Sequence, residues 1–291
     1  MSDIYQLSGT KITANYKPIP DNIRKNVKRV ILFTNARDEL KIKEWAAHHL
    51  LIGFDLIYIF DHKSNTPLTN VFNNFDKRVI IERCEMNNPI KKTLMKKAVS
   101  IAKSMGVDWM LYLDSDEFLV LNSFRGVKHM LNMFNYADQL MIHWLMFGSN
   151  FHVKEPIGLI VENYTKTEAK LNQHVKSFVR PSKVTSISNP HFFYITSSVR
   201  NIIITNKVAP AQATHNIDLT FEQVHAYIAH YVIQSEETYM RRKVILPADD
   251  TNTFRRRDNT TIHKSCNDVD NFHVRDKYAE HIHKLLLLYS S

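Results

Sequence analysis

The sequence is poor in the residues that define several large protein classes. Its 291 residues include only two cysteines, Cys84 and Cys266, and no CxxC pattern. A disulfide framework is therefore excluded, and we expect both cysteines to be the reduced thiols typical of a reducing compartment. Only 6 glycines and 9 prolines are present, which argues against a fibrous chain or long low-complexity linkers.

Long hydrophobic runs are also missing. No stretch reaches the roughly 18 uncharged apolar residues that a membrane span needs. The first six residues have neither the basic region nor the apolar core of a signal peptide. We therefore expect a soluble protein without a membrane span, located in the cytoplasm. The Lys, Asn and Ile usage is typical of an AT-rich bacterial or large-virus genome, and for a virus this would be the host cytoplasm.

Several catalytic motifs do not occur. There is no GxGxxG, no Walker A loop, no GxSxG and no HExxH, and the 15 histidines show no zinc spacing. These absences argue against dinucleotide oxidoreductases, P-loop enzymes, α/β-hydrolases and zinc proteases.

The sequence does have an excess of positive charge, with a net charge of +9. Such an excess favours anionic partners, including phosphorylated small molecules. The charge is dispersed, with short basic runs such as Arg255-Arg256-Arg257. Without a basic stripe, nucleic-acid binding is not expected.

Short apolar segments alternate with helical patterns up to residue 144. Strands are predicted at residues 29–34, 56–60, 79–81, 109–113 and 140–144. Helices are predicted over residues 38–52, 88–105 and 123–134, with Asp38, Asn88 and Ser123 as N-caps and Pro89 as a first helical residue. This alternation predicts an α/β fold with a mainly parallel sheet flanked by helices.

The second half of the sequence is less regular. Residues 150–230 predict short strands and turns, and helical patterning returns after Ser235 and at residues 278–289. We expect an N-terminal arm (residues 1–26), a main α/β domain (residues 27–245), and a loop with a C-terminal helix packed on it (residues 246–291). Residues 249–261 are rich in Asp, Asn, Thr and Arg and predict a mobile loop.

Polar residues follow three of the predicted strands, at residues 35–39, 61–64 and 114–117. Ligands bind outside the carboxyl ends of the strands in open parallel sheets, so these groups are expected to converge. A lone guanidinium at such an edge, Arg37, suits phosphate or carboxylate binding. Asp61 can accept hydrogen bonds from a ribose or a base, or it can be a turn residue.

Asp114-Ser115-Asp116 is the strongest local signal. Two carboxylates one residue apart at a strand end can hold a hard cation such as Mg²⁺ or Mn²⁺, which commonly shares its shell with substrate phosphates. The same residues can instead form a turn. His230 follows an apolar run, so it is either a hydrogen-bonded core residue or an additional metal ligand that the fold brings to this site.

Seven ordered motifs over residues 28–245 resemble those of one group of glycosyltransferases, the family 2-like and family 92-like enzymes of the GT-A fold. They resemble the patterns "RNE…EW…H", "yDn.S", "w…fiDvDEF", "W..FGs", "K.ivrP" and "HY..kS.eef", together with a Gly-Phe-Asp before the second strand. The matching segments are residues 35–49, 53–55, 60–64, 109–118, 144–149, 176–181 and 230–239.

The resemblance implies a GT-A fold and inverting transfer of a hexose from a nucleotide-sugar, preferably a UDP-sugar, with Mn²⁺ or Mg²⁺. It implies a glycan, glycolipid, glycoprotein or other hydroxyl acceptor. Asp114, Asp116 and His230 would serve the metal. The donor would be bound by Asn35, Arg37, Glu39, Asp61, Ser64, Asp114 and Ser115. Asp38 departs from the family, which usually has Asn there.

The sequence does not single out a catalytic base. Glu162 is favoured and Asp218 is the alternative, because both fall in the half where acceptor contacts are expected. Glu117 adjoins the metal motif and is interpreted as structural. Residues 144–149 either shape an acceptor pocket or end a buried strand, and residues 255–257 either meet donor phosphates or form a solvated loop.

Two other functions compete with sugar transfer. A metal-dependent nucleotidyltransferase would also use Asp carboxylates and a basic pocket, but it usually has a Gly-rich loop after the first strand, and residues 35–39 contain no glycine. A non-catalytic sugar- or nucleic-acid-binding protein with a decayed metal site is the second alternative, although the Asp114/Asp116 pair is intact.

Overall fold

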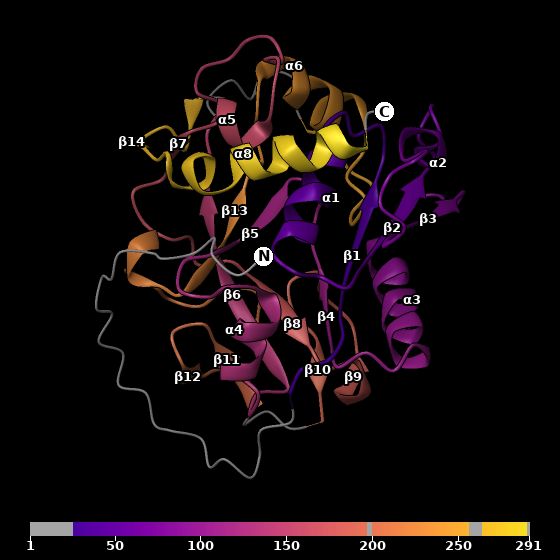
Figure 1. The fold of residues 1–291 in the computed structure, drawn as a ribbon, viewed down its shortest axis with the longest axis vertical. Coiled ribbons are helices and arrows are strands. Elements are labelled where there is room, and N and C mark those ends of the chain that lie inside the picture. Colours follow the sequence, from indigo (N-terminus) through magenta and orange to yellow (C-terminus); the bar gives the residue numbers. More distant parts are fainter. Residues whose placement is uncertain (1–25, 197–199, 256–263, 290–291) are drawn as a thin grey trace.

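A computed structural model describes residues 26–196, 200–255 and 264–289 (Figure 1). The predicted N-terminal arm therefore lies almost wholly outside the described residues. Within the described part of the chain, ten strands form one sheet with the order β12-β11-β6-β8-β4-β1-β2-β3 and a branch made of β5 and β13. No helix among the described residues has the length and apolar character that crossing a membrane requires.

The first half of the sheet is parallel, as predicted. It consists of β1 (Val30–Ala36), β2 (Leu56–His62), β3 (Val79–Cys84) and β4 (Trp109–Tyr112). Successive residues of β1 are buried on opposite faces: Val30 and Leu32 join one apolar core, whereas Ile31 and Phe33 join another. A strand covered on both faces must be apolar throughout, which explains its unbroken apolar sequence.

The second half of the sheet mixes strand directions. β8 (Val175–Val179) is antiparallel to both β4 and β6 (Gln139–Met146), and β11 (Asn201–Ile203) with β12 (Lys207–Val208) completes the edge. β13 (Ala226–His230) runs parallel to β6 and antiparallel to β5 (Glu117–Leu121). The sequence did not predict β5 as a strand, and it predicted β13 only as part of a region of short strands and turns. Both are five-residue, fully buried runs.

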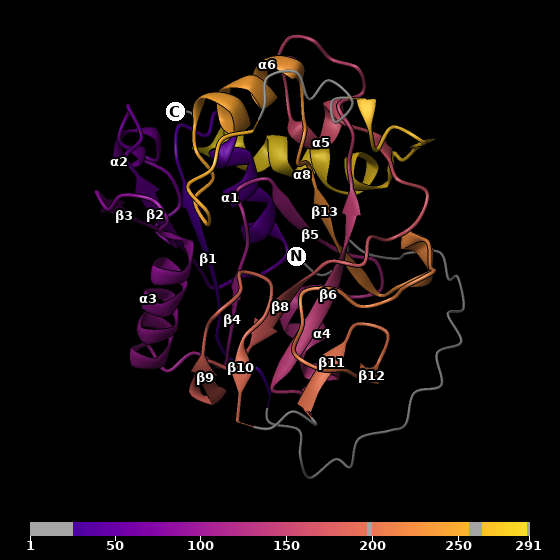
Figure 2. The ribbon, with the colours of Figure 1, turned by 180° about the vertical axis from the view of Figure 1, so that it is seen from behind.

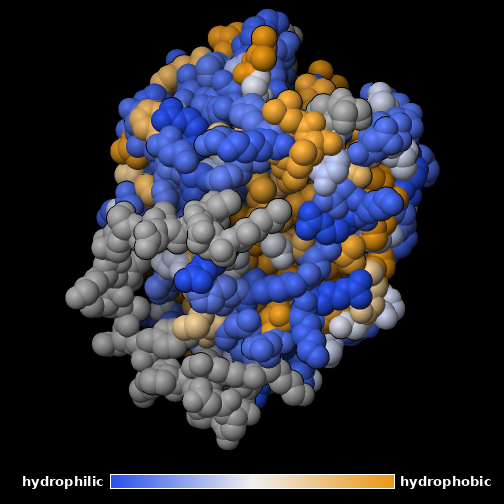
Figure 3. Space-filling model, viewed as in Figure 1, coloured by the Kyte–Doolittle hydropathy of each residue, from blue (hydrophilic) through white to orange (hydrophobic). Residues whose placement is uncertain are grey.

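Helices cover both faces of the sheet. α3 (Lys91–Ser104) packs on one face, and α1 (Ile42–Leu51), α4 (Val127–Met133) and α8 (His273–Leu288) belong to the core on the other. Figure 1 shows α8 lying across α1 near the top of the molecule. The face seen in Figure 3 is mostly hydrophilic, with apolar residues in separate groups.

Shorter elements complete the described fold. They are α2 (Leu68–Val71), α5 (Ile160–Asn163), β7 (Lys166–Thr167), η2 (Pro181–Lys183), β9 (Val184–Ser186), β10 (Tyr194–Ile195), η4 (Phe221–Gln223), α6 (Glu236–Tyr239), the π-helical η5 (Met240–Ile245) and β14 (Val269–Asp270). The chain after α6 passes beside β1, as Figure 2 shows from behind.

The three predicted helix caps were wrong. α1 begins at Ile42, because Asp38 has a left-handed φ of 51° and its carboxylate accepts the N–H of Asn65 at 2.7 Å. α3 begins at Lys91, after a cis Asn88–Pro89 bond. α4 begins at Val127, and the Ser123 hydroxyl bonds His225 instead. In the first and third cases a contact distant in sequence replaces the expected cap.

The polar side of α1 faces the core and holds two distant segments. The Glu44 carboxylate accepts the backbone N–H groups of Ile160 (2.7 Å) and Val161 (3.0 Å) at the start of α5. The Trp45 indole N–H donates to the Glu117 carbonyl at 2.7 Å, and His48 bonds the Leu119 carbonyl at 2.8 Å. α1 therefore fixes β5, the strand that directly follows residues 114–116.

This arrangement predicts a pH-dependent stability. Burial raises the pKa of Glu44 to about 8, although the two N–H donors oppose the shift. Between its ordinary pKa of 4.5 and about 8, the folded chain keeps a proton that the unfolded chain releases, so the Glu44 contribution to stability falls as pH rises. In urea unfolding at pH 5 and pH 8, a Glu44→Gln variant should lose this contribution, because glutamine does not ionise.

Buried histidines such as His48 have lowered pKa values and act in the opposite direction below pH 6.5. They are common to both proteins, so the difference between wild type and variant isolates Glu44. An equal pH dependence in the two proteins would contradict the assignment.

Candidate active site

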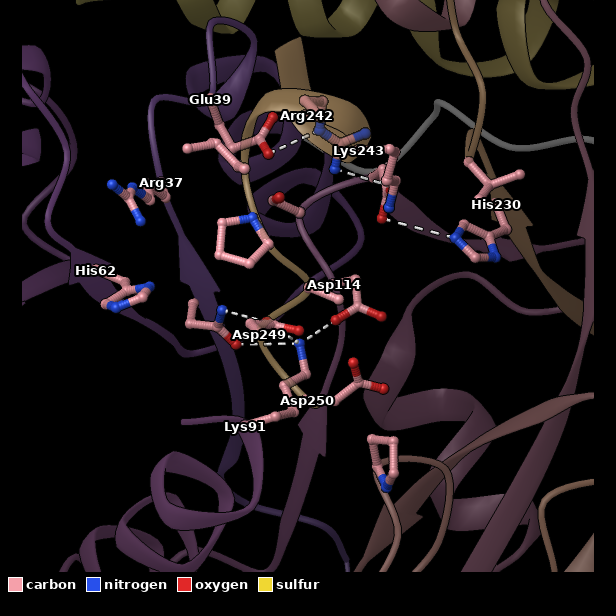
Figure 4. Close-up of a pocket in the computed structure, with 18 of the residues that line it drawn as sticks. Arg37, Glu39, His62, Lys91, Asp114, His230, Arg242, Lys243, Asp249 and Asp250 are labelled. Carbon is pink, nitrogen blue, oxygen red and sulfur yellow. Dashed lines mark hydrogen bonds and ion pairs between the residues drawn. The ribbon is translucent and has the colours of Figure 1, made fainter. Parts of the chain in front are cut away.

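A cavity of about 350 Å³ lies at the carboxyl ends of β1, β2 and β4. The strand order reverses between β1 and β4, and a reversal of this kind opens a crevice where ligands bind in α/β sheets. The close-up in Figure 4 shows side chains from the strand ends and from the chain after α6 converging on this space. The residues that line it and carry the arguments below are Asn35, Arg37, Glu39, His62, Lys91, Asp114, Ser115, Asp116, Trp144, Lys176, His191, His230, Arg242, Lys243, Asp249, Asp250 and Arg255.

Two buried lysines hold Asp114. One carboxylate oxygen meets the Lys91 ammonium, and the other lies 2.9 Å from Lys176 Nζ. Burial by itself would raise the pKa of Asp114, but the two ammonium groups hold it well below the usual range. Asp114 is therefore an ionised carboxylate whose charge the protein itself compensates.

Asp116 joins three parts of the chain. It is 1% exposed, and its Oδ2 atom lies 3.0 Å from Arg242 Nη2 on η5. Arg242 also donates to the Glu39 carboxylate at 2.8 Å. On the other side, Asp116 Oδ1 lies 3.7 Å from Nε2 of His230, the last residue of β13. Burial would raise the pKa of Asp116, but Arg242 and then Lys243 lower it far below the usual value.

His230 is held neutral. Burial lowers the pKa of its ring to about 4, and the nearby Asp116 and Asp114 carboxylates only partly oppose this shift. The ring also packs against Trp144, with centroids 4.3 Å apart. A neutral imidazole offers the lone pair that a metal requires.

Asp116 and His230 together fit a divalent cation. Their 3.7 Å separation is too long for a hydrogen bond. Two ligand atoms that each lie about 2.1 Å from one ion can be at most roughly 4.2 Å apart. The separation of Asp116 and His230 is below this limit. In the described part of the chain, no three His, Cys, Asp or Glu side chains form a metal-binding group, so substrate and water would have to complete the shell. Asp114 fits less well, since both of its oxygens are engaged by lysines.

The predicted donor residues divide into two groups. Asn35, Arg37, Glu39 and Ser115 line the cavity, and Arg37 Nε is buried without a hydrogen-bond partner among the described residues. It is thus able to donate to an anion.

Asp61 and Ser64 do not line the cavity. The Asp61 carboxylate is 1% exposed and accepts the backbone N–H groups of Ser64 (3.2 Å) and Leu68 (2.9 Å), and it pairs with Arg83 at 3.0 Å. The Ser64 hydroxyl accepts the N–H of Asp38. The hydrogen bonds of both side chains shape the turn after β2. This arrangement does not support the direct nucleoside contact predicted for Asp61.

The two predicted base candidates also lie outside the cavity. Glu162 accepts the N–H of Leu159 at 3.1 Å and bonds His283 of α8 at 2.8 Å. Asp218 is exposed and pairs with Lys170. Neither carboxylate reaches the space around Asp116, so the structure gives no support for a role as base.

Sequence analysis missed several cavity residues. Lys91 looked like one more lysine of an amphipathic helix, and Arg242 gave no local signal. Asp249 fell in the predicted mobile loop, yet its carbonyl accepts the N–H groups of Ile90 (2.8 Å) and Lys91 (3.0 Å), and its carboxylate accepts Asn35 Nδ2 at 2.6 Å. The loop is therefore fixed at this end.

Residues 255–257, in the rest of the predicted loop, are only partly described by the structure. Arg255 lines the cavity, whereas Arg256 and Arg257 lie outside the described residues. Including Arg255, six basic side chains face the cavity against five carboxylates. The small excess of positive charge in the cavity suits an anionic ligand.

A comparison with known protein families gives one match. The profile described as glycosyltransferase family 92 matches residues 31–269, a range that begins in β1 and contains every residue of the cavity. No curated protein matches the chain.

The Asp114 ion pairs predict a coupled effect on stability. Lys176 is 1% exposed and Asp114 is 32% exposed, so a Lys176→Met variant leaves a half-buried carboxylate partly uncompensated and should lower the free energy of unfolding by about 2 kcal/mol. Adding Asp114→Asn should recover part of this loss, because the uncompensated charge is then gone. Urea unfolding of the two single variants and the double variant measures the coupling, and strictly additive losses would contradict the pairing.

Proposed function

Since this chain belongs to glycosyltransferase family 92, we propose that it moves a hexose from a nucleotide-sugar, preferably a UDP-sugar, to a hydroxyl group. The acceptor would be a glycan, glycolipid or glycoprotein, and the transfer would invert the anomeric carbon. Family membership shows a glycosyltransferase, and it therefore disfavours the nucleotidyltransferase and non-catalytic alternatives. The observation that carries the finer proposal is the cavity in which Asp116 and His230 lie among six basic side chains.

The cations around the cavity suit a diphosphate. Arg37 lines the cavity near Glu39, as Figure 4 shows. Lys243 lines it with its Nζ atom 3.8 Å from Asp116 Oδ2, and Arg255 lines it from the chain after η5. Guanidinium and ammonium groups bind phosphate oxygens through charge-assisted hydrogen bonds. In this proposal they bind the donor's diphosphate and remain in place to receive the growing negative charge as it departs.

Asp116 and His230 would hold the Mn²⁺ or Mg²⁺, which supplies further stabilisation of the departing diphosphate. Arg242 keeps Asp116 in position through its second oxygen, at 3.0 Å. Asp114, for which the resemblance implied a metal contact, would instead orient Lys91 and Lys176 through the ion pairs that its two oxygens make.

Aromatic side chains line part of the cavity: Trp144, near the end of β6, and His191. Trp144 stacks on His174 with centroids 5.1 Å apart and contacts His191 at 5.0 Å. Flat apolar surface of this kind can cover one face of a sugar ring and exclude water from the anomeric carbon. Of residues 144–149, Trp144 and Met146 line the cavity, which favours the alternative in which this segment shapes an acceptor pocket.

Donor turnover tests the proposal. UDP-glucose, UDP-galactose, UDP-N-acetylglucosamine and GDP-mannose are incubated with the protein and Mn²⁺, Mg²⁺ or EDTA, and the released nucleoside diphosphate is measured. We expect one UDP-sugar to be consumed, and only with metal. Asp116→Asn should lower turnover by about 100-fold, whereas Asp218→Asn, an exposed site outside the cavity, should change it by less than about threefold.

Two results would count against this account. Consumption of none of the four donors would contradict the donor class. Equal turnover in Mn²⁺ and EDTA would contradict the role given to Asp116 and His230, while leaving the family assignment intact.

A further inference from the structure

Five carboxylates line the cavity, and four of them already face a cation. The cation-to-carboxylate distances are 2.8 Å for Glu39 and Arg242, 2.9 Å for Asp114 and Lys176, 3.0 Å for Asp116 and Arg242, and 3.3 Å for Asp249 and Lys91. A carboxylate next to a cation binds a proton less readily. These four groups are therefore suited to holding charge and poorly suited to accepting a proton.

Asp250 is the fifth carboxylate. Among the described residues, its side chain has no ion pair and no hydrogen bond, and it is exposed where it lines the cavity. Figure 4 shows its carboxylate directed into the cavity below Asp114.

The backbone that carries Asp250 is nevertheless fixed. The preceding residue, Asp249, accepts the N–H groups of Ile90 and Lys91 through its carbonyl and binds Asn35 through its carboxylate. Asp250 is therefore held at the cavity wall while its own side chain remains available.

We propose that Asp250 is the catalytic base, an assignment that rests on the proposed inverting transfer. The acceptor hydroxyl oxygen bonds to the anomeric carbon as the bond from that carbon to the diphosphate oxygen breaks. The diphosphate leaves with the electron pair, and the hydroxyl proton passes to the Asp250 carboxylate. Because Asp250 is exposed, it returns this proton to solvent after the transfer.

His191 is the main competitor for this role. Its ring lines the same cavity, and its Nδ1 bonds the Val175 carbonyl at 2.9 Å, which leaves Nε2 as a possible proton acceptor. A protonated His191 would, however, add a second cation near the buried Lys176. Asp250, by contrast, is an exposed carboxylate that lines the cavity and has no cation paired with it among the described residues, and this geometry favours Asp250.

The test uses water and azide as nucleophiles, so that the natural acceptor is not needed. Turnover of the UDP-sugar that the donor panel selects is measured with Mn²⁺ for wild type, Asp250→Asn and His191→Gln. A water nucleophile must lose a proton, so Asp250→Asn should lower hydrolysis about 100- to 10,000-fold. Donor affinity, measured by calorimetry without turnover, should change by less than about threefold, because Asp250 makes no contact with the cations of the site.

Azide carries no proton and needs no base. Sodium azide should therefore restore UDP release in Asp250→Asn and give a glycosyl azide of inverted configuration, identified by NMR. Asp270→Asn, an exposed carboxylate paired with Lys166 outside the cavity, serves as the matched control and should behave as wild type.

Three results would overturn the assignment. They are Asp250→Asn turnover within about threefold of wild type, a loss of turnover that azide does not restore, and an azide-restored loss in His191→Gln alone. If wild type consumes no nucleotide-sugar, the proposed function fails and the assignment fails with it. Wild-type turnover with an unaffected Asp250→Asn removes the base assignment only.

Discussion

The site depends on one ionic arrangement, the Asp114 carboxylate between the ammonium groups of two buried lysines, Lys91 and Lys176. Both lysines are almost completely buried, and a buried ammonium is stable only when it is paired. The pairing fixes the start of α3 and the middle of β8 against the end of β4. Once Asp114 is fixed, the next two residues have little freedom, and Asp116 is directed toward His230 and Arg242.

The same arrangement divides the carboxylates of the cavity by their function. Asp114 and Asp249 hold lysines, Asp116 has one oxygen on Arg242 and the other toward a neutral histidine, and Asp250 remains unpaired among the described residues. Their environments differ although their chemical groups are identical. If the proposed function holds, such a division would let one cavity bind a diphosphate, hold a metal and accept a proton through different side chains.

Features of the fold that depend on local sequence were predictable, whereas those that depend on contacts between distant residues were not. The parallel strands were predicted because burial on both faces demands unbroken apolar runs such as β1. The strand ends then led to Arg37, Asp116 and the cavity itself. The helix caps failed because Asp38 and Ser123 bond to distant segments, and local propensity carries no information about such contacts.

The remaining site residues show the same limit. Arg242 and Asp249 reach the strand ends from more than 200 positions along the chain, which no local pattern records. Glu162 was chosen as a carboxylate in the acceptor half, yet the sequence does not reveal that α8 and its own backbone already engage it. Choosing between equivalent carboxylates requires knowing which of them have partners.

The central claim is that Asp116 and His230 hold a metal against the diphosphate of a nucleotide-sugar donor. Its most direct test is the binding of Mn²⁺ to the wild-type protein, followed by electron paramagnetic resonance, with and without UDP. Metal and nucleotide that share one site must raise each other's affinity by the same factor, and we predict a factor of at least about ten, or about 1.4 kcal/mol. Independent binding of Mn²⁺ and UDP, or binding of UDP without any effect of the metal, would contradict the claim.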